Sequence, residues 1–227
     1  IRPSMFRPSR NIVLGVCGVG IPASIQNLLN VTGMTVLNNF TSAFGSDAVA
    51  AMGISQKVNM VPLQIALGFS QGIMPLISYN YASGNVKRMK QTLFFTARLA
   101  LSFMVLVTAG YFLGSGTLTR MFMKNEAIVA YGTRFLRGMC LALPFLCTDF
   151  LAVGVFQACG LGRKALVFAL LRKIVLEIPA LYLLNMLWPL YGLAYAQTLA
   201  EVVLAIAAVA VLYRLFRSLE LRQRETA

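Results

Sequence analysis

The chain has 227 residues, of which 58% are hydrophobic and 12% are charged, and its mean hydropathy is +0.74. This composition leaves too little polar surface to cover a soluble globule, and it predicts an integral protein of the lipid bilayer. The formal net charge is +13, but the basic residues stand between apolar segments, so we expect no nucleic-acid partner. The sequence has no histidine and no Walker A motif, which excludes His-based metal sites, His-dependent catalysis and P-loop ATP hydrolysis. We therefore expect no catalytic residue, no metal site, no cofactor and no enzymatic activity.

Six long apolar segments can be marked along the chain, at 11–44, 48–81, 92–114, 128–159, 165–187 and 191–216. Each is long enough to cross a bilayer as a helix, and three of them exceed the length of a perpendicular span. The pattern predicts an all-α integral membrane fold, a six-helix transmembrane bundle over 11–216. Prolines inside the segments predict bent helices. These prolines are Pro22, Pro62, Pro75, Pro144 and Pro179.

Polar side chains interrupt the apolar character of the first segment. Helical spacing places Ser24, Asn27 and Asn38 on one side, and amides there need partners that lipid does not offer. The stripe predicts either the lining of a water-filled cavity or hydrogen bonds that only hold neighbouring helices together. For the cavity interpretation the candidate lining residues are Asn27, Asn30 and Met34, together with Gln64 of the second segment.

Four ionisable residues lie deep inside the apolar segments, where an unpaired charge is costly. They are Lys57, Asp149, Glu177 and Glu201. Asp149 is predicted to be a carboxylate that responds to H⁺ or Na⁺, with Lys57 as its partner. The alternative is a static role, either as an ion pair with Lys57 or as a hydrogen-bonded packing residue. Glu177 and Glu201 are secondary candidates for cation coupling, with the alternative that they satisfy backbone groups at helix breaks.

The ends of the segments carry an uneven charge. An even number of spans places both termini on one side, where twelve basic residues gather, against Arg120 and Lys124 on the other. The twelve are Arg2, Arg7, Arg10, Lys87, Arg88, Lys90, Arg163, Lys164, Arg214, Arg217, Arg222 and Arg224. This asymmetry predicts a cytoplasmic basic segment at 1–10 and a cytoplasmic tail at 217–227. The chain begins with Ile1, and we expect it to be a fragment of a longer polypeptide.

Three stretches carry a resemblance to a known family. They are GIPASIQNLLNVTGMTVLNNF, PLISYNYASGNVKRMKQT, and FQACGLGRKAL followed by LLRKIVLEIPALYLL. In this order they resemble the carboxy-terminal six-helix lobe of the multidrug and toxic compound extrusion (MATE) transporters, with the closest likeness to the DinF and MepA-like branch.

The resemblance implies a twelve-helix exporter of two six-helix lobes, in which the amino-terminal lobe of the same polypeptide is the missing partner. It implies that the first two segments are helices seven and eight and that Asp149 lies on helix ten. Some members carry an acidic cation ligand in that helix, but the acidic partner of the first segment is missing here, since this stretch offers only Asn and Gln.

The function expected from the resemblance is a cation-coupled antiporter of the cell membrane that exchanges H⁺ or Na⁺ for organic cations and drugs. Two other classes remain open. A lipid-linked saccharide flippase of the same superfamily would need a strongly cationic cavity, and a channel-type or structural subunit would need a pore made by oligomerisation. A membrane enzyme is the least favoured, because no nucleophile has a base at a recognisable spacing.

Overall fold

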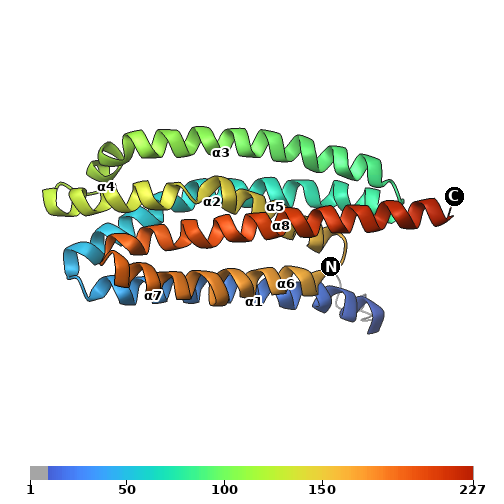
Figure 1. The fold of residues 1–227 in the computed structure, drawn as a ribbon, viewed down its shortest axis with the longest axis horizontal. Coiled ribbons are helices and arrows are strands. Elements are labelled where there is room, and N and C mark those ends of the chain that lie inside the picture. Colours follow the sequence, from blue (N-terminus) through green and yellow to red (C-terminus); the bar gives the residue numbers. More distant parts are fainter. Residues whose placement is uncertain (1–9, 227) are drawn as a thin grey trace, which may run out of the picture.

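The computed structural model describes residues 10–226, and within this range it contains helices and short connections but no strand. The elements are α1 (Arg10–Ser42), α2 (Ser46–Ala82), α3 (Val86–Phe122), α4 (Glu126–Cys140), α5 (Leu143–Ala158), α6 (Gly162–Leu170), the π-helix η2 (Leu171–Glu177), α7 (Ile178–Leu187) and α8 (Tyr191–Thr226). They form an elongated bundle in which the start of α1 and the end of α8 lie at the same end (Figure 1). The six predicted segments match these elements in order, and the all-α prediction is confirmed.

Two of the six segments are interrupted rather than continuous. The fourth is the pair α4 and α5, bent by 44° where Pro144 stands at the start of α5. The fifth is the succession of α6, η2 and α7, with Pro179 at the start of α7. By length and composition four described helices could each cross a membrane, or five spans if the bent pair counts as one. The fifth segment falls outside this count because it is divided into short helices and carries charged residues.

Two helices, α3 and α8, run well beyond the apolar segments that predicted them. Helix α3 starts at Val86 rather than at residue 92, because the Asn85 side chain caps it by accepting a hydrogen bond from the Arg88 backbone N–H. It ends at Phe122 instead of at residue 114, and α8 continues through most of the segment expected to be a tail. Helix α1 begins at Arg10, so the rest of the predicted basic segment lies outside the described residues. Apolarity therefore predicts the apolar part of these helices, not their full length.

Helix α5 is the centre of the bundle. Eleven of its sixteen residues are buried, and the larger core cluster gathers around it from α2, α3 and α8. A second cluster joins α2, α4, α7 and the start of α8. The outer faces keep large apolar side chains exposed, as on α3, where Phe95 is 72% and Leu113 is 82% exposed. A surface of this kind is stable only against hydrocarbon or another protein.

Helices α4 and α8 approach closely at Gly138. A Cβ atom at this position would lie 2.8 Å from the Ala194 Cβ, and the Thr198 hydroxyl donates a hydrogen bond to the Gly138 carbonyl. Small residues at such a contact let two membrane helices pack backbone to backbone.

Gly138→Ala is therefore expected to destabilise the bundle by about 1–3 kcal/mol, because the added methyl group has no room. Thermal unfolding in detergent would measure this, with Gly110→Ala as the control, since a Cβ at Gly110 would meet nothing within 4 Å. An equal effect of the two substitutions would contradict the assignment of a tight contact.

Candidate functional site

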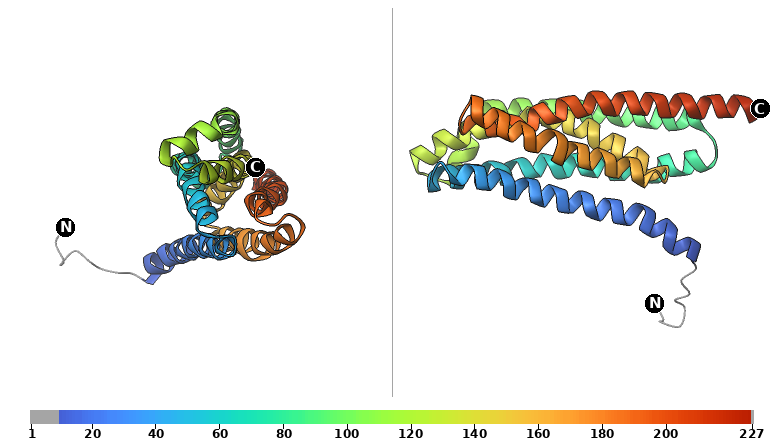
Figure 2. Two further views of the ribbon diagram at one scale, coloured as in Figure 1. Left: turned by 90° about the vertical axis from the view of Figure 1, so that its left-hand side faces the viewer. Right: turned by 60° about the horizontal axis from the view of Figure 1, so that its bottom comes forward.

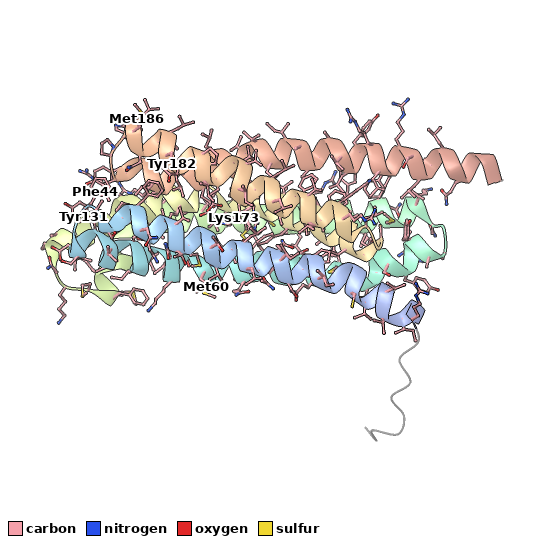
Figure 3. The ribbon with its side chains drawn as sticks, turned by 90° about the horizontal axis from the view of Figure 1, so that it is seen from below. Phe44, Met60, Tyr131, Lys173, Tyr182 and Met186 are labelled. Atoms are coloured by element: carbon pink, nitrogen blue, oxygen red, sulfur yellow. The ribbon has the colours of Figure 1, made fainter. Side chains whose placement is uncertain are left out.

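A cavity of about 420 Å³ opens near the middle of the bundle. Its wall comes from α1, α2, α4, α5, η2 and α8, and a volume of this size accommodates a small organic molecule. All four residues predicted to line a cavity, Asn27, Asn30, Met34 and Gln64, lie in this wall. The side chains of Met60 and Lys173, both in the wall, are marked in Figure 3.

The wall combines amides with apolar side chains. Its other amides are Gln56, Asn59 and Gln197, and its apolar groups include Met60, Met139 and Phe150. The Gln56 amide donates a hydrogen bond to Asn38 at 3.2 Å, which confirms an interhelical bond within the polar stripe of α1. The Asn59 Oδ1 is buried and has no hydrogen-bond partner among the described residues. The polar stripe thus both joins helices and faces the cavity.

Arg172 is part of the cavity wall, and its side chain is only 2% exposed. Its guanidinium donates to Asn30 Oδ1 at 2.5 Å and to Asp149 Oδ2 at 3.4 Å. The Glu201 carboxylate approaches its Nε at 4.0 Å, and the guanidinium stands 5.2 Å from the centre of the Phe150 ring. One buried cation on η2 is thereby shared by two buried carboxylates and an amide, which come from α5, α8 and α1.

A second ion pair lies beside the first. The Lys173 ammonium donates to both carboxylate oxygens of Glu177, at 2.7 and 2.5 Å. It reaches across the face of α1, because Gly33 has no side chain there: a Cβ at Gly33 would lie 3.0 Å from Lys173 Nζ. Figure 3 shows Lys173 midway along the molecule, between α1 and the α6–η2–α7 segment.

The π-helix η2 carries three of these five charged residues. A π-helical turn accommodates an extra residue and interrupts the regular i to i−4 hydrogen bonds, and such turns are frequent at functional sites. Here the π-helix has seven residues, and three of them, Arg172, Lys173 and Glu177, are charged and buried. We call Asp149, Arg172, Lys173, Glu177 and Glu201 the buried charge cluster.

The cluster has unequal charge. With all groups ionised, three carboxylates face two cations, so one negative charge is in excess. Three of its polar atoms, Asp149 Oδ1, Arg172 Nε and Glu201 Oε2, are buried without a hydrogen-bond partner among the described residues. Buried polar groups in this state are costly. The two unpartnered carboxylate oxygens, on Asp149 and Glu201, are suited to receive a further cation or a proton.

The expected pair of Asp149 with Lys57 is not formed. Lys57 is exposed, and the salt bridge of Asp149 is with Arg172. Asp149 lies behind Arg172 rather than in the cavity wall, whereas Glu177 and Glu201 do line the cavity. Both glutamates face the basic residues of η2 instead of the backbone at a helix break.

Sequence reasoning missed Arg172 and Lys173 as site residues. The signal was present: both stand inside the apolar segment 165–187, and two adjacent basic residues there need acidic partners as much as the carboxylates need basic ones. Apolar length alone predicts a simple span over 165–187, although this segment contains three charged residues.

The sequence is similar to that of known membrane transport proteins. The family model described as MatE matches residues 22–183. The multidrug export protein MepA of Staphylococcus saprophyticus is 33% identical over 217 residues, which are 93% of this chain and 47% of that protein. MepA of Staphylococcus haemolyticus is 34% identical over 211 residues, 92% of this chain and 46% of that protein. The chain therefore spans about half the length of the curated relatives it matches.

Solved structures show the same fold. An outward-facing multidrug resistance MATE family transporter of the MOP superfamily superposes with a TM-score of 0.90 at 21% identity, covering 97% of this chain and 50% of that one. The Vibrio cholerae transporter VcmN in its bent form gives 0.85 at 20% identity, covering 91% and 47%. The fold is that of one six-helix lobe of the twelve-helix transporters. Because the family model covers most of its length, this chain belongs to the MatE family.

Proposed function

We propose that this chain is one lobe of a cation-coupled multidrug exporter that exchanges H⁺ or Na⁺ for organic cations. The observation that carries the proposal is the buried charge cluster, which borders a cavity large enough for a small drug and has one negative charge in excess. The name of the MepA relatives, multidrug export protein, supports the substrate class.

The cavity wall suits varied organic cations. Thioethers such as Met34 and Met60 adapt to different apolar shapes, and the Phe150 ring offers a face to a positive charge. Amides such as Asn27 and Gln64 can accept or donate hydrogen bonds without fixing one substrate geometry. A wall of this composition favours breadth over selectivity.

The excess charge gives a reason for exchange. A proton, a Na⁺ ion or an organic cation can each neutralise it, and two of them together would leave a positive charge in a low-dielectric site. The coupling ion and the drug therefore compete for the cluster, and each stabilises a different orientation of the cavity. Competition of this kind is the basis of antiport.

The flippase alternative receives less support from the same residues. A site for an anionic, lipid-linked sugar needs an excess of positive charge, whereas both cations of the cluster are paired and the sum is negative. A channel subunit is disfavoured by the family membership.

The proposed location is a cell membrane, with the described start of α1 and end of α8 on the cytoplasmic side. The described start of α1 and the described end of α8 lie at the same end of the bundle (Figure 1), and the basic residues at that end support this orientation.

A space-filling substitution tests the cavity. In the full-length natural polypeptide that carries this sequence, Met34→Trp is expected to lower export of bulky organic cations severalfold, because the indole occupies the cavity. The control is Leu106→Trp on α3, where Leu106 is 71% exposed and outside the cavity wall. Efflux driven by an imposed H⁺ or Na⁺ gradient is measured in proteoliposomes. Equal export by both variants and the unmodified protein would remove this cavity from the transport path.

A further inference from the structure

A cleft of about 320 Å³ lies where α3 begins and α8 ends. Its wall consists of Lys90 from α3 and of Tyr213, Arg217, Glu220 and Leu221 from α8. Lys87 and Arg214 are exposed one turn away from Lys90 and Arg217 on the same helices. Basic residues from two helices that are far apart in the sequence thus gather around the cleft.

The fold holds these two helix ends together. Val86 and Met89 of α3 and Leu215 and Phe216 of α8 are buried in one core cluster. The Gln223 side chain reaches the α2–α3 turn, since a Cβ at Gly84 would lie 3.7 Å from its Nε2. Figures 1 and 2 show the last turns of α8 beside this turn. The cleft is therefore a fixed feature of the packed bundle rather than a chance approach of two mobile chains.

The charges of the cleft are only partly satisfied. The Lys90 ammonium pairs with Glu220 at 2.5 Å and stands 5.7 Å from the centre of the Phe216 ring. An ammonium has three N–H donors, so donors remain for another acceptor. Arg217 has no acidic partner within 4 Å among the residues whose side chains the structure describes. A planar guanidinium with free donors and a nearby ammonium form a suitable site for a phosphate group.

The side of the cleft nearer the membrane core is aromatic and apolar. Tyr213 lies one turn before Arg217 and is 67% exposed, and Phe94 lies one turn after Lys90 and is 64% exposed. Aromatic rings with this exposure are typical of the boundary between headgroups and acyl chains. The cations are therefore at the level of lipid headgroups, with rings below them that can contact acyl chains.

From this arrangement we infer that the cleft between the start of α3 and the end of α8 binds the phosphate headgroup of an anionic phospholipid. Arg217 and Lys90 donate to the phosphate oxygens, Lys87 and Arg214 add positive potential, and Tyr213 and Phe94 contact the glycerol and the upper acyl chain. Basic pockets between transmembrane helices are known to select such headgroups. Glu220 limits the affinity, because it occupies one donor of Lys90 and repels the phosphate.

The test measures lipid retention by native mass spectrometry. The full-length natural polypeptide is reconstituted into nanodiscs that contain equal amounts of phosphatidylglycerol and phosphatidylcholine. It is then released from them, and the lipid that stays bound is measured. We expect preferential retention of phosphatidylglycerol, lowered about fivefold by Arg217→Gln and further by Lys90→Gln/Arg217→Gln, at about fivefold per removed charge. Glu220→Gln is expected to raise retention, because it frees Lys90.

The matched control is Arg88→Gln. It removes the same charge from the first turn of α3, but Arg88 lies two positions from Lys90 and so projects from the other side of the helix. An unchanged retention in this variant supports a defined site. An equal loss in Arg88→Gln and Arg217→Gln, or equal retention of the two lipids by the unmodified protein, would overturn the inference. Since the cleft shares no residue with the central cavity, these results are independent of whether the protein exports drugs.

Discussion

Replacing Arg172 with methionine is expected to lower the free energy of unfolding by about 3–5 kcal/mol and to abolish export, the largest effect of any single substitution in the cavity. The guanidinium is the cation shared by Asp149 and Glu201, and both carboxylates are 1% exposed. Without it two like charges remain buried with no opposite charge between them. Methionine retains most of the apolar stem of arginine, so the lost free energy of unfolding reports the missing charge rather than missing packing volume.

Thermal unfolding of the full-length protein in detergent measures this effect. The control is Arg163→Met. Arg163 is exposed at the start of α6, and its substitution removes an equal charge from the same segment. Neutralising the two acidic partners as well, in Arg172→Met/Asp149→Asn/Glu201→Gln, is expected to recover much of the lost stability. A stable single variant, or a triple variant as unstable as the single one, would show that Arg172 does not hold these carboxylates.

Much of the fold could be predicted because the relevant signal is local. Apolar length places six segments in the correct order, and proline correctly marked the bend at Pro144. The full lengths of α3 and α8 could not be predicted in the same way. Their terminal turns carry charged residues that a hydropathy criterion excludes. The Asn85 cap does indicate in the sequence where α3 starts.

The candidate site was predicted unevenly for a related reason. Asn27, Asn30 and Gln64 stand out because amides are rare in lipid-facing segments, and helical spacing gives their direction. The partner of Asp149 depends instead on which helices pack against α5. Lys57 and Arg172 were both available basic residues, and only the tertiary arrangement places Arg172 at 3.4 Å and leaves Lys57 exposed.

Glu201→Gln and Asp149→Asn are each expected to abolish gradient-driven export while leaving the protein folded. Either substitution reduces the buried charge cluster to two carboxylates and two cations, so no excess charge remains for H⁺, Na⁺ or a drug to neutralise. Arg172 retains one acidic partner in both variants, which preserves the packing. The control Glu126→Gln removes a carboxylate from an exposed ion pair between the end of α3 and the start of α4, and should leave export unchanged.

The double variant separates this charge argument from a role of either residue alone. Asp149→Asn/Glu201→Gln leaves Arg172 without a carboxylate among its described contacts, so we expect a loss of stability that exceeds the sum of the two single effects. The measurements are drug export from proteoliposomes under an imposed H⁺ or Na⁺ gradient, and thermal unfolding of the same preparations. If one single variant retained gradient-driven export, that carboxylate would have no place in coupling. Additive stability effects would show that Asp149 and Glu201 do not share Arg172, since a shared cation makes the loss of the second carboxylate more damaging than the loss of the first.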